Sequence, residues 1–203
     1  YDAILGARFE DARTLLASAC PPAPRESCLA LEPVALWWEI QIDPHSRALD
    51  DKLEMTSAAA IDAADRWSRR AQSNAEAWFY VAGSYGPIEQ LRVLRGDRLK
   101  AARAALTIRS ALERALALDP TLQDAHFGIG LYRYVADVAP AALKILRWLL
   151  LMPGGNRTEG LREMLDSRDH SNTHDMDPSD VCLDRDAASA TRSGDRSVPN
   201  VLP

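Results

Sequence analysis

The sequence predicts an all-α protein. Aromatic residues make up only 6% of the 203 residues, and there are only ten glycines. Few segments alternate apolar and polar residues as half-buried strands do. The strongest local signal covers residues 111–140, where ALERALALDP ends one helix at Asp119-Pro120 and TLQDAHFGIGLYRYVADVAP begins the next. This pattern predicts a helical hairpin, and a protein built from such hairpins.

Apolar residues at spacings of three and four, with turn residues between the groups, divide the chain into helices. The predicted helices cover about residues 2–19, 33–41, 47–71, 75–100, 98–118, 122–137 and 141–152, and another begins over 158–165. Within 75–100, a kink or a change of helix is expected near Gly86-Pro87.

The first two helices are separated by prolines. Leu5, Phe9 and Ala12 fall on one face of the first, and Pro21, Pro22 and Pro24 end it, because proline has no N–H and clashes with the preceding turn. Pro33 suits the first turn of the second helix, where its missing donor is not needed. Trp37 and Trp38 point about 100° apart, so one indole is expected to enter the core and the other to pack against a neighbour.

The third and fourth helices meet at Ser73-Asn74. Alanines such as Ala60 and Ala64 let a neighbouring helix come close to the third helix, and Trp67 fills its wider end. Ser73 or Asn74 is expected to cap the helix that follows.

The most apolar run of the chain is Ala141 to Met152. A helix that is apolar all round is normally buried, and this one could also mediate self-association. The alternative is a helix at a membrane surface, with Lys144 and Arg147 at the lipid headgroups. The run is too short to span a bilayer.

Cys20 and Cys28 bracket the turn PPAPRES. A disulfide between them would clamp the first hairpin and would imply an oxidising compartment. The alternative is two small thiols packed as apolar side chains. There is no CxxC pair, so no zinc site or other metal site is expected.

The composition changes at Asp166. Residues 166–203 contain eight Asp, four Arg, many Ser and Thr, and no aromatic residue. Such a segment cannot bury enough apolar surface to offset the entropy of ordering. The sequence therefore predicts a helical domain over residues 1–165 and a low-complexity, acidic, disordered tail over residues 166–203.

Two stretches resemble tetratricopeptide (TPR) repeats, which are helix-turn-helix units of about 34 residues with a W-x2-L-G-x2-Y start and an A-x3-F…P end. The matching positions are Trp78, Val81, Ala82 and Tyr85 at one start, Ala115 and Pro120 at its end, and Ile129 and Gly130 at the next start, with His126 in the tryptophan position. Trp78 to Pro120 is longer than one repeat, so it holds either an insertion around residues 86–99 or longer helices.

The ordered blocks AEAWFYVAGSYG, RVLRG, ALERALALDP and FGIGLYRYVADVAPAALKILRWLLLMPGGNR together resemble a bacterial TPR family of unassigned function. The resemblance implies a right-handed α-α superhelix and a periplasmic or otherwise exported scaffold, with no catalytic residues. It stops after residue 165, where that family continues with further helices. We therefore expect a fragment end or a reading-frame slip there.

The function expected from this resemblance is binding of a partner protein or peptide in a helical groove. In the repeat register, the groove-facing positions are Glu76, Phe79, Asp124, Phe127, Leu131 and Tyr134. Aromatic residues there would supply contact area, and the acids would set the charge preference.

Other functions find little support in the sequence. The net charge of −5 and the lack of a basic stripe argue against nucleic-acid binding. No nucleophile motif or cofactor motif is present, so no enzyme activity and no cofactor are expected. The catalytic alternative is a helical-toroid hydrolase acting on sugars, which would need paired acids in a cleft.

Overall fold

The computed structural model describes residues 2–138 and 154–174, and every regular element in this part of the chain is an α-helix. The helices are α1 (Asp2–Leu5), α2 (Phe9–Ala19), α3 (Arg25–Ile40), α4 (Asp50–Arg70), α5 (Ala75–Leu94), α6 (Arg98–Leu118), α7 (Gln123–Val138) and α9 (Arg157–His174). The all-α prediction is confirmed.

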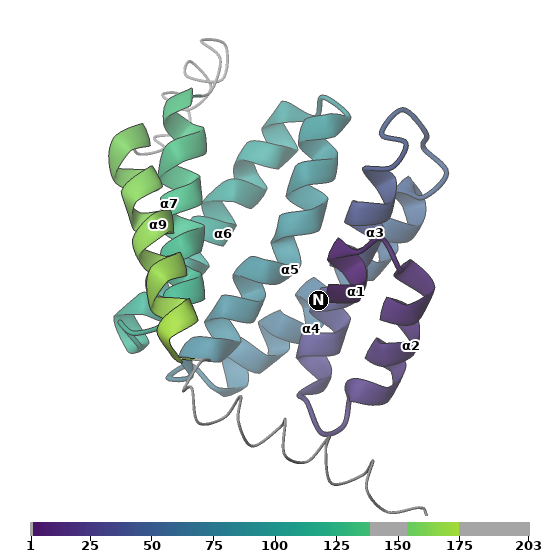
Figure 1. Ribbon diagram of the computed structural model, residues 1–203, viewed down its shortest axis with the longest axis horizontal. Helices are drawn as coiled ribbons and strands as arrows, with labels where there is room; N and C mark the ends of the chain where they lie inside the picture. Colours follow the sequence, from purple (N-terminus) through teal and green to yellow (C-terminus); the bar gives the residue numbers. More distant parts are fainter. Residues whose placement is uncertain (1, 139–153, 175–203) are drawn as a thin grey trace, which may run out of the picture.

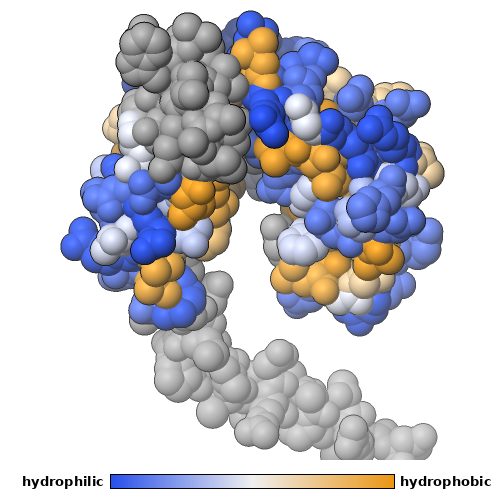
Figure 2. Space-filling view, turned by 90° about the horizontal axis from the view of Figure 1, so that it is seen from above, coloured by the Kyte–Doolittle hydropathy of each residue, from blue (hydrophilic) through white to orange (hydrophobic). Residues whose placement is uncertain are grey.

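Each helix packs mainly on its neighbours in sequence. Contacts join α2 to α3, α3 to α4, α4 to α5, α5 to α6, α6 to α7 and α7 to α9, and α3 also packs on α5. The helices stand side by side, with α1 and α2 at one end of the array and α7 and α9 at the other (Figure 1). Figure 2 shows that the array bends around a hollow that is open on one side.

Three apolar clusters hold the array together. The largest joins α4, α5, α6 and α7 through small residues such as Ala82 and Ala115, with larger side chains around them. A second cluster joins α3, α4 and α5 around Leu53 and Leu91. Trp37 packs against it, which confirms that one of the two indoles enters the core, whereas Trp38 is exposed.

Polar caps fix the helix starts. The Asn74 side chain accepts a hydrogen bond from the Ala77 N–H at 3.2 Å, which confirms the predicted cap of α5. Asp97 caps α6 in the same way, through the Lys100 N–H. Between these helices Gly96 has a φ of +80°, the left-handed conformation that ends many helices and that glycine adopts most easily.

Arg95 joins the end of α5 to the loop before α4. Its guanidinium donates to both carboxylate oxygens of Asp50 at 2.8 Å, and to the carbonyls of Pro44 and Ser46 at 2.6 Å. The side chains of Arg95 and Asp50 are each only 15% exposed. This fork of charge-assisted hydrogen bonds fixes the α3–α4 loop.

Three predicted boundaries are wrong. The first helix is broken at Gly6-Ala7, where Ala7 has a φ of 55°, so α1 is a single turn. The second begins at Arg25 rather than near Pro33. The fourth ends at Leu94 rather than near residue 100, and it runs through Pro87 as one helix, so of the two alternatives at Gly86-Pro87 the change of helix is excluded. Pro33 and Pro87 are tolerated inside α3 and α5 because helix residues on both sides of each proline are buried. Tertiary packing of this kind can override the low helix propensity of proline.

The predicted tail begins too early. Residues 166–174 continue α9 rather than forming a tail, because α9 is anchored beyond Leu165. The buried Ser167 hydroxyl donates to the Gln123 carbonyl at 2.6 Å and ties α9 to the start of α7. The rest of the predicted tail and the apolar run 141–152 lie outside the described residues. Within the described ranges no helix is long and apolar enough to cross a membrane.

Candidate functional site

Helix α7 presents a row of exposed apolar side chains. Phe127, Leu131, Val135 and Val138 are 46%, 42%, 52% and 47% exposed. Their spacings of four, four and three residues place them on one face of the helix. We call these four residues the α7 row. A contiguous apolar surface of this kind on a folded helix is typical of a binding surface.

The other faces of α7 are already occupied. Ala125 and Ile129 are buried in the cluster shared with α5 and α6. At Gly128 a side chain would collide with Leu112 of α6, because an added Cβ would lie 2.7 Å from a Leu112 methyl carbon. The α7 row therefore lies on a face that neither α6 nor the core uses.

The third side of α7 is covered by α9. Arg133 forms ion pairs with Glu159 at 3.2 Å and with Glu163 at 2.9 Å. The Arg157 N–H donates to the Asp137 carboxylate at 3.2 Å. Together with the Ser167 hydrogen bond, these contacts hold α9 along the whole of α7, so the α7 row lies on a rigid pair of helices.

Two exposed acids on different helices lie near Tyr80. Burial raises the pKa of the Tyr80 phenol, a hydrogen bond with Ser27 offsets part of this rise, and the nearby carboxylates of Glu76 and Asp124 add to it. Glu76 belongs to α5 and Asp124 to α7, and both are exposed. The structure thus brings the two predicted acids near one aromatic residue. Asp124 lies one turn before Phe127, the first residue of the α7 row.

The predicted groove residues divide into two groups. Phe127 and Leu131 are exposed on α7, next to Asp124. Phe79 and Tyr134 are half-buried. The Phe79 ring lies edge-on to Tyr80, with 5.9 Å between ring centroids, and packs on the core cluster. Substitution of Phe79 would therefore disturb packing as well as any binding.

Val135 and Val138 were not among the predicted binding residues. Their signal was present in the sequence, because they continue the spacing of Phe127 and Leu131 by four and three residues. Two further exposed leucines on α9, Leu161 and Leu165, were also overlooked.

Glu89 is a further residue that the sequence analysis missed. Burial in α5 raises the pKa of its carboxyl to about 7, and the charge of Arg92 offsets part of this rise. A carboxyl that titrates near neutral pH is what general acid–base catalysis uses.

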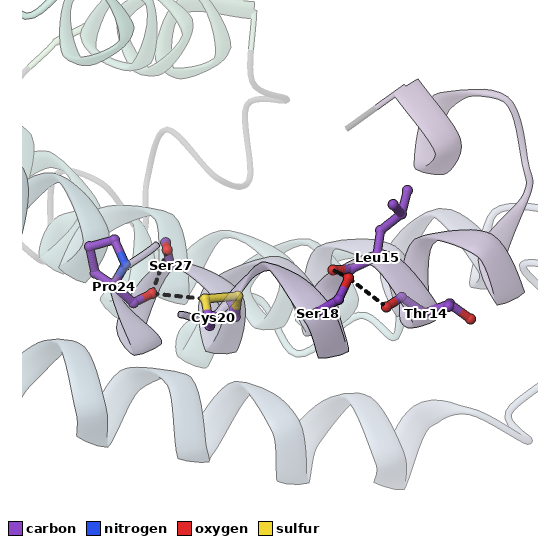
Figure 3. Close-up of a disulfide and its surroundings, with 7 residues drawn as sticks. Thr14, Leu15, Ser18, Cys20, Pro24 and Ser27 are labelled. Atoms are coloured by element: carbon purple, nitrogen blue, oxygen red, sulfur yellow. Dashed lines mark hydrogen bonds between the residues drawn. A yellow bond between two sulfur atoms is a disulfide. The ribbon is translucent and has the colours of Figure 1, made fainter. Parts of the chain in front are cut away.

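Of the two alternatives for Cys20 and Cys28, a disulfide or two packed thiols, the structure contains the disulfide. Cys20 and Cys28 are bonded, with 6.4 Å between their Cα atoms (Figure 3). Cys20 Sγ lies 3.1 Å from the Pro24 carbonyl oxygen, and the Ser27 hydroxyl donates to the same oxygen at 2.6 Å. The bond closes the turn between α2 and α3 and fixes the start of α3.

Across the described ranges, no group of three or more His, Cys, Asp or Glu residues could hold a metal ion. Comparison with known proteins found no family model, no curated protein and no solved structure that matches this chain.

Proposed function

We propose that this protein is a scaffold of TPR type that binds a segment of a partner protein on the α7 row. The observation that carries the proposal is the row itself, with four apolar side chains between 42% and 52% exposed on one helix face. Exposed apolar surface is unfavourable in water, and binding a partner would remove it from water.

The packing of the helices supports the TPR assignment. Neighbouring helices pair in sequence order, and α3 packs on α5 as well as on α4. In a solenoid, each repeat contacts only its neighbours along the chain, and the contacts between these helices follow that order. The curved array in Figure 2 gives such a stack a hollow side. A right-handed superhelix and a non-catalytic role belong to this proposal.

The site also indicates the chemistry of the partner. Apolar anchors at i, i+4, i+8 and i+11 fit an amphipathic helix, whose own anchors recur at the same period. Glu76 at the start of α5 and Asp124 at the start of α7 both lie near Tyr80, and they favour a partner with Lys or Arg at that end. We therefore propose an amphipathic helical segment with a basic end as the ligand.

The Cys20–Cys28 disulfide supports a location outside the cytosol. Structural disulfides persist in oxidising compartments such as the bacterial periplasm. A periplasmic or exported scaffold is part of the proposal for this reason.

The proposal is tested by comparing variants of the full chain as bait. Phe127→Ser/Leu131→Ser removes the centre of the α7 row without opening the core. Val93→Ser/Leu94→Ser is the matched control, because these residues are exposed on α5 and lie outside the row. Partners retained by the wild type and the control but lost by the row variant, with equal melting temperatures, would support the proposal. A partner set that is unchanged by the row variant would contradict it.

A further inference from the structure

A small pocket between α3 and α4 is a second candidate site. Its volume is about 170 Å³, and it is lined by Arg25, Glu26, Leu29, Ala63, Arg66 and Arg70. The helices that line it, α3 and α4, are separated from α7 by α5 and α6 (Figure 1), so the pocket is independent of the α7 row. We propose that this pocket binds the phosphate group of a small soluble molecule.

The charges that line the pocket favour an anion. Arg66 is paired with Asp62 of its own helix, and Arg70 lies 3.4 Å from Glu26. Within the described part of the chain, Arg25 has no carboxylate within 4.0 Å. Surface ion pairs contribute at most about 1 kcal/mol each, so Arg66 and Arg70 can exchange a carboxylate for a stronger anion at little cost.

The local backbone places Arg25 firmly. Arg25 is the first residue of α3, a 16-residue helix whose N-cap, Pro24, makes no side-chain hydrogen bond to it. The positive end of the helix dipole therefore adds to the positive charge of the guanidinium. The Cys20–Cys28 disulfide closes the loop that contains Arg25. This fixes the backbone of Arg25 before a ligand arrives, which lowers the entropic cost of binding.

The size and shape of the pocket select the ligand. Its volume of about 170 Å³ is several times the roughly 30 Å³ share of one water molecule in the liquid. It is smaller than the roughly 300–1,000 Å³ of a typical cofactor site. Three arginines line the pocket, and a guanidinium suits a phosphomonoester because its planar fork can donate two parallel hydrogen bonds to phosphate oxygens. Leu29 and Ala63 give the pocket an apolar part that would face the organic portion of the ligand.

Glu26 makes the proposal testable in two directions. It is the only acid that lines the pocket, and its charge opposes an incoming phosphate. Glu26→Gln should therefore bind phosphate more tightly, whereas Arg25→Gln should bind it less tightly. A structural role for these residues would not produce changes of opposite sign.

The experiment is an NMR titration of the full-length protein with inorganic phosphate, and then with glycerol 3-phosphate, at constant ionic strength. We expect Arg25→Gln to raise the Kd about tenfold, as expected for loss of one charge-assisted hydrogen-bonding group. Glu26→Gln should lower the Kd about threefold, a modest electrostatic effect. Arg103→Gln, on the exposed surface of α6, removes the same charge elsewhere and should leave the Kd unchanged.

Three results would overturn the proposal. The first is phosphate binding no tighter than chloride, and the second is an equal loss in Arg25→Gln and Arg103→Gln. The third is retention on phosphatidic acid vesicles without any binding of soluble phosphate, which would assign the pocket to a lipid headgroup. None of these measurements depends on the α7 row, so failure here is distinguishable from failure of the proposed function.

Discussion

The backbones of α7 and α9 touch where Gly130 faces Gly160. A Cβ added to Gly160 would lie 2.5 Å from the Gly130 carbonyl oxygen, and one added to Gly130 would lie 2.7 Å from the Gly160 carbonyl oxygen. Both obstacles are backbone atoms, which cannot rotate out of the way as a side chain can. The two glycines therefore set how closely α9 approaches the helix that carries the proposed binding surface.

Gly160→Ala should destabilise the protein by about 1–3 kcal/mol, the usual effect of forcing extra atoms into a packed contact. Gly83→Ala is its control, because Gly83 lies inside α5 with no atom within 4 Å of an added Cβ. Alanine is the better helix former, so this variant should be more stable by about 0.5–1 kcal/mol. Chemical denaturation measures both. Equal effects of the two substitutions would contradict the close approach of α7 and α9.

Arg95→Ala should destabilise the protein by about 2–4 kcal/mol, because Asp50 and the two loop carbonyls lose their donor in a mostly buried setting. Arg95→Lys should recover little of this loss, since an ammonium group cannot reproduce the planar fork. Arg98→Ala, an exposed change three residues away, should stay within about 0.5 kcal/mol of the wild type. Urea unfolding compares the three variants, and full stability in Arg95→Lys would count against the role of the fork.

Loss of the disulfide should lower the free energy of unfolding by about 2–3 kcal/mol. The bond joins residues eight apart in sequence, and closing a loop of that size restricts the unfolded chain by about this amount. Urea unfolding with and without reductant measures the effect. The third cysteine, Cys182, is replaced by Ser in all samples so that reductant acts only on the Cys20–Cys28 bond. Cys20→Ser/Cys28→Ser should match the reduced protein and should not respond to reductant. An unchanged unfolding midpoint on reduction would show that the two thiols are not bonded.

Glu89 should make stability depend on pH. Burial raises the pKa of its carboxyl from 4.5 to about 7 in the folded protein, so the folded state holds this proton more tightly than the unfolded state. Stability should therefore fall as pH rises from about 4.5 to 7 and then level off, by on the order of 1–3 kcal/mol from this group.

Glu89→Gln should remove this loss of stability at higher pH. At pH 8 it should be more stable than the wild type, and at pH 4.5 the two should be similar. Glu54→Gln, an exposed change on α4 that also removes one negative charge, is the control and should follow the wild-type curve. Thermal melts across this pH range give the answer, and parallel curves for Glu89→Gln and the wild type would refute the assignment.

Much of the fold could be predicted because it depends on local rules. The turn at Asp119-Pro120 follows directly from proline chemistry, and there the Asp119 carboxylate also accepts hydrogen bonds from Thr121. The cap at Asn74 and the different burial of Trp37 and Trp38 follow from the same kind of rule.

The remaining features depend on contacts that are distant in sequence. Pro33 and Pro87 stay inside helices because the turns on both sides of each are buried. The extension of α9 depends on the hydrogen bond between Ser167 and Gln123, 44 residues apart. For the candidate site, Phe127 and Leu131 were found from the repeat pattern. The raised pKa of Glu89 could not be predicted, because nothing near it in sequence reveals that it is half-buried in the folded protein.

The most direct test of the central proposal is site-specific photocrosslinking of the full-length protein in its own cells. A photoreactive amino acid replaces Leu131 in the α7 row or Arg103 on α6, and mass spectrometry identifies the adducts. We expect the Leu131 probe to give a discrete adduct with one partner, crosslinked through an amphipathic segment with a basic end, and the Arg103 probe to give none. The absence of an adduct at Leu131, an adduct only with a second copy of this chain, or the same adduct from both probes would contradict the proposal that the α7 row binds a partner protein.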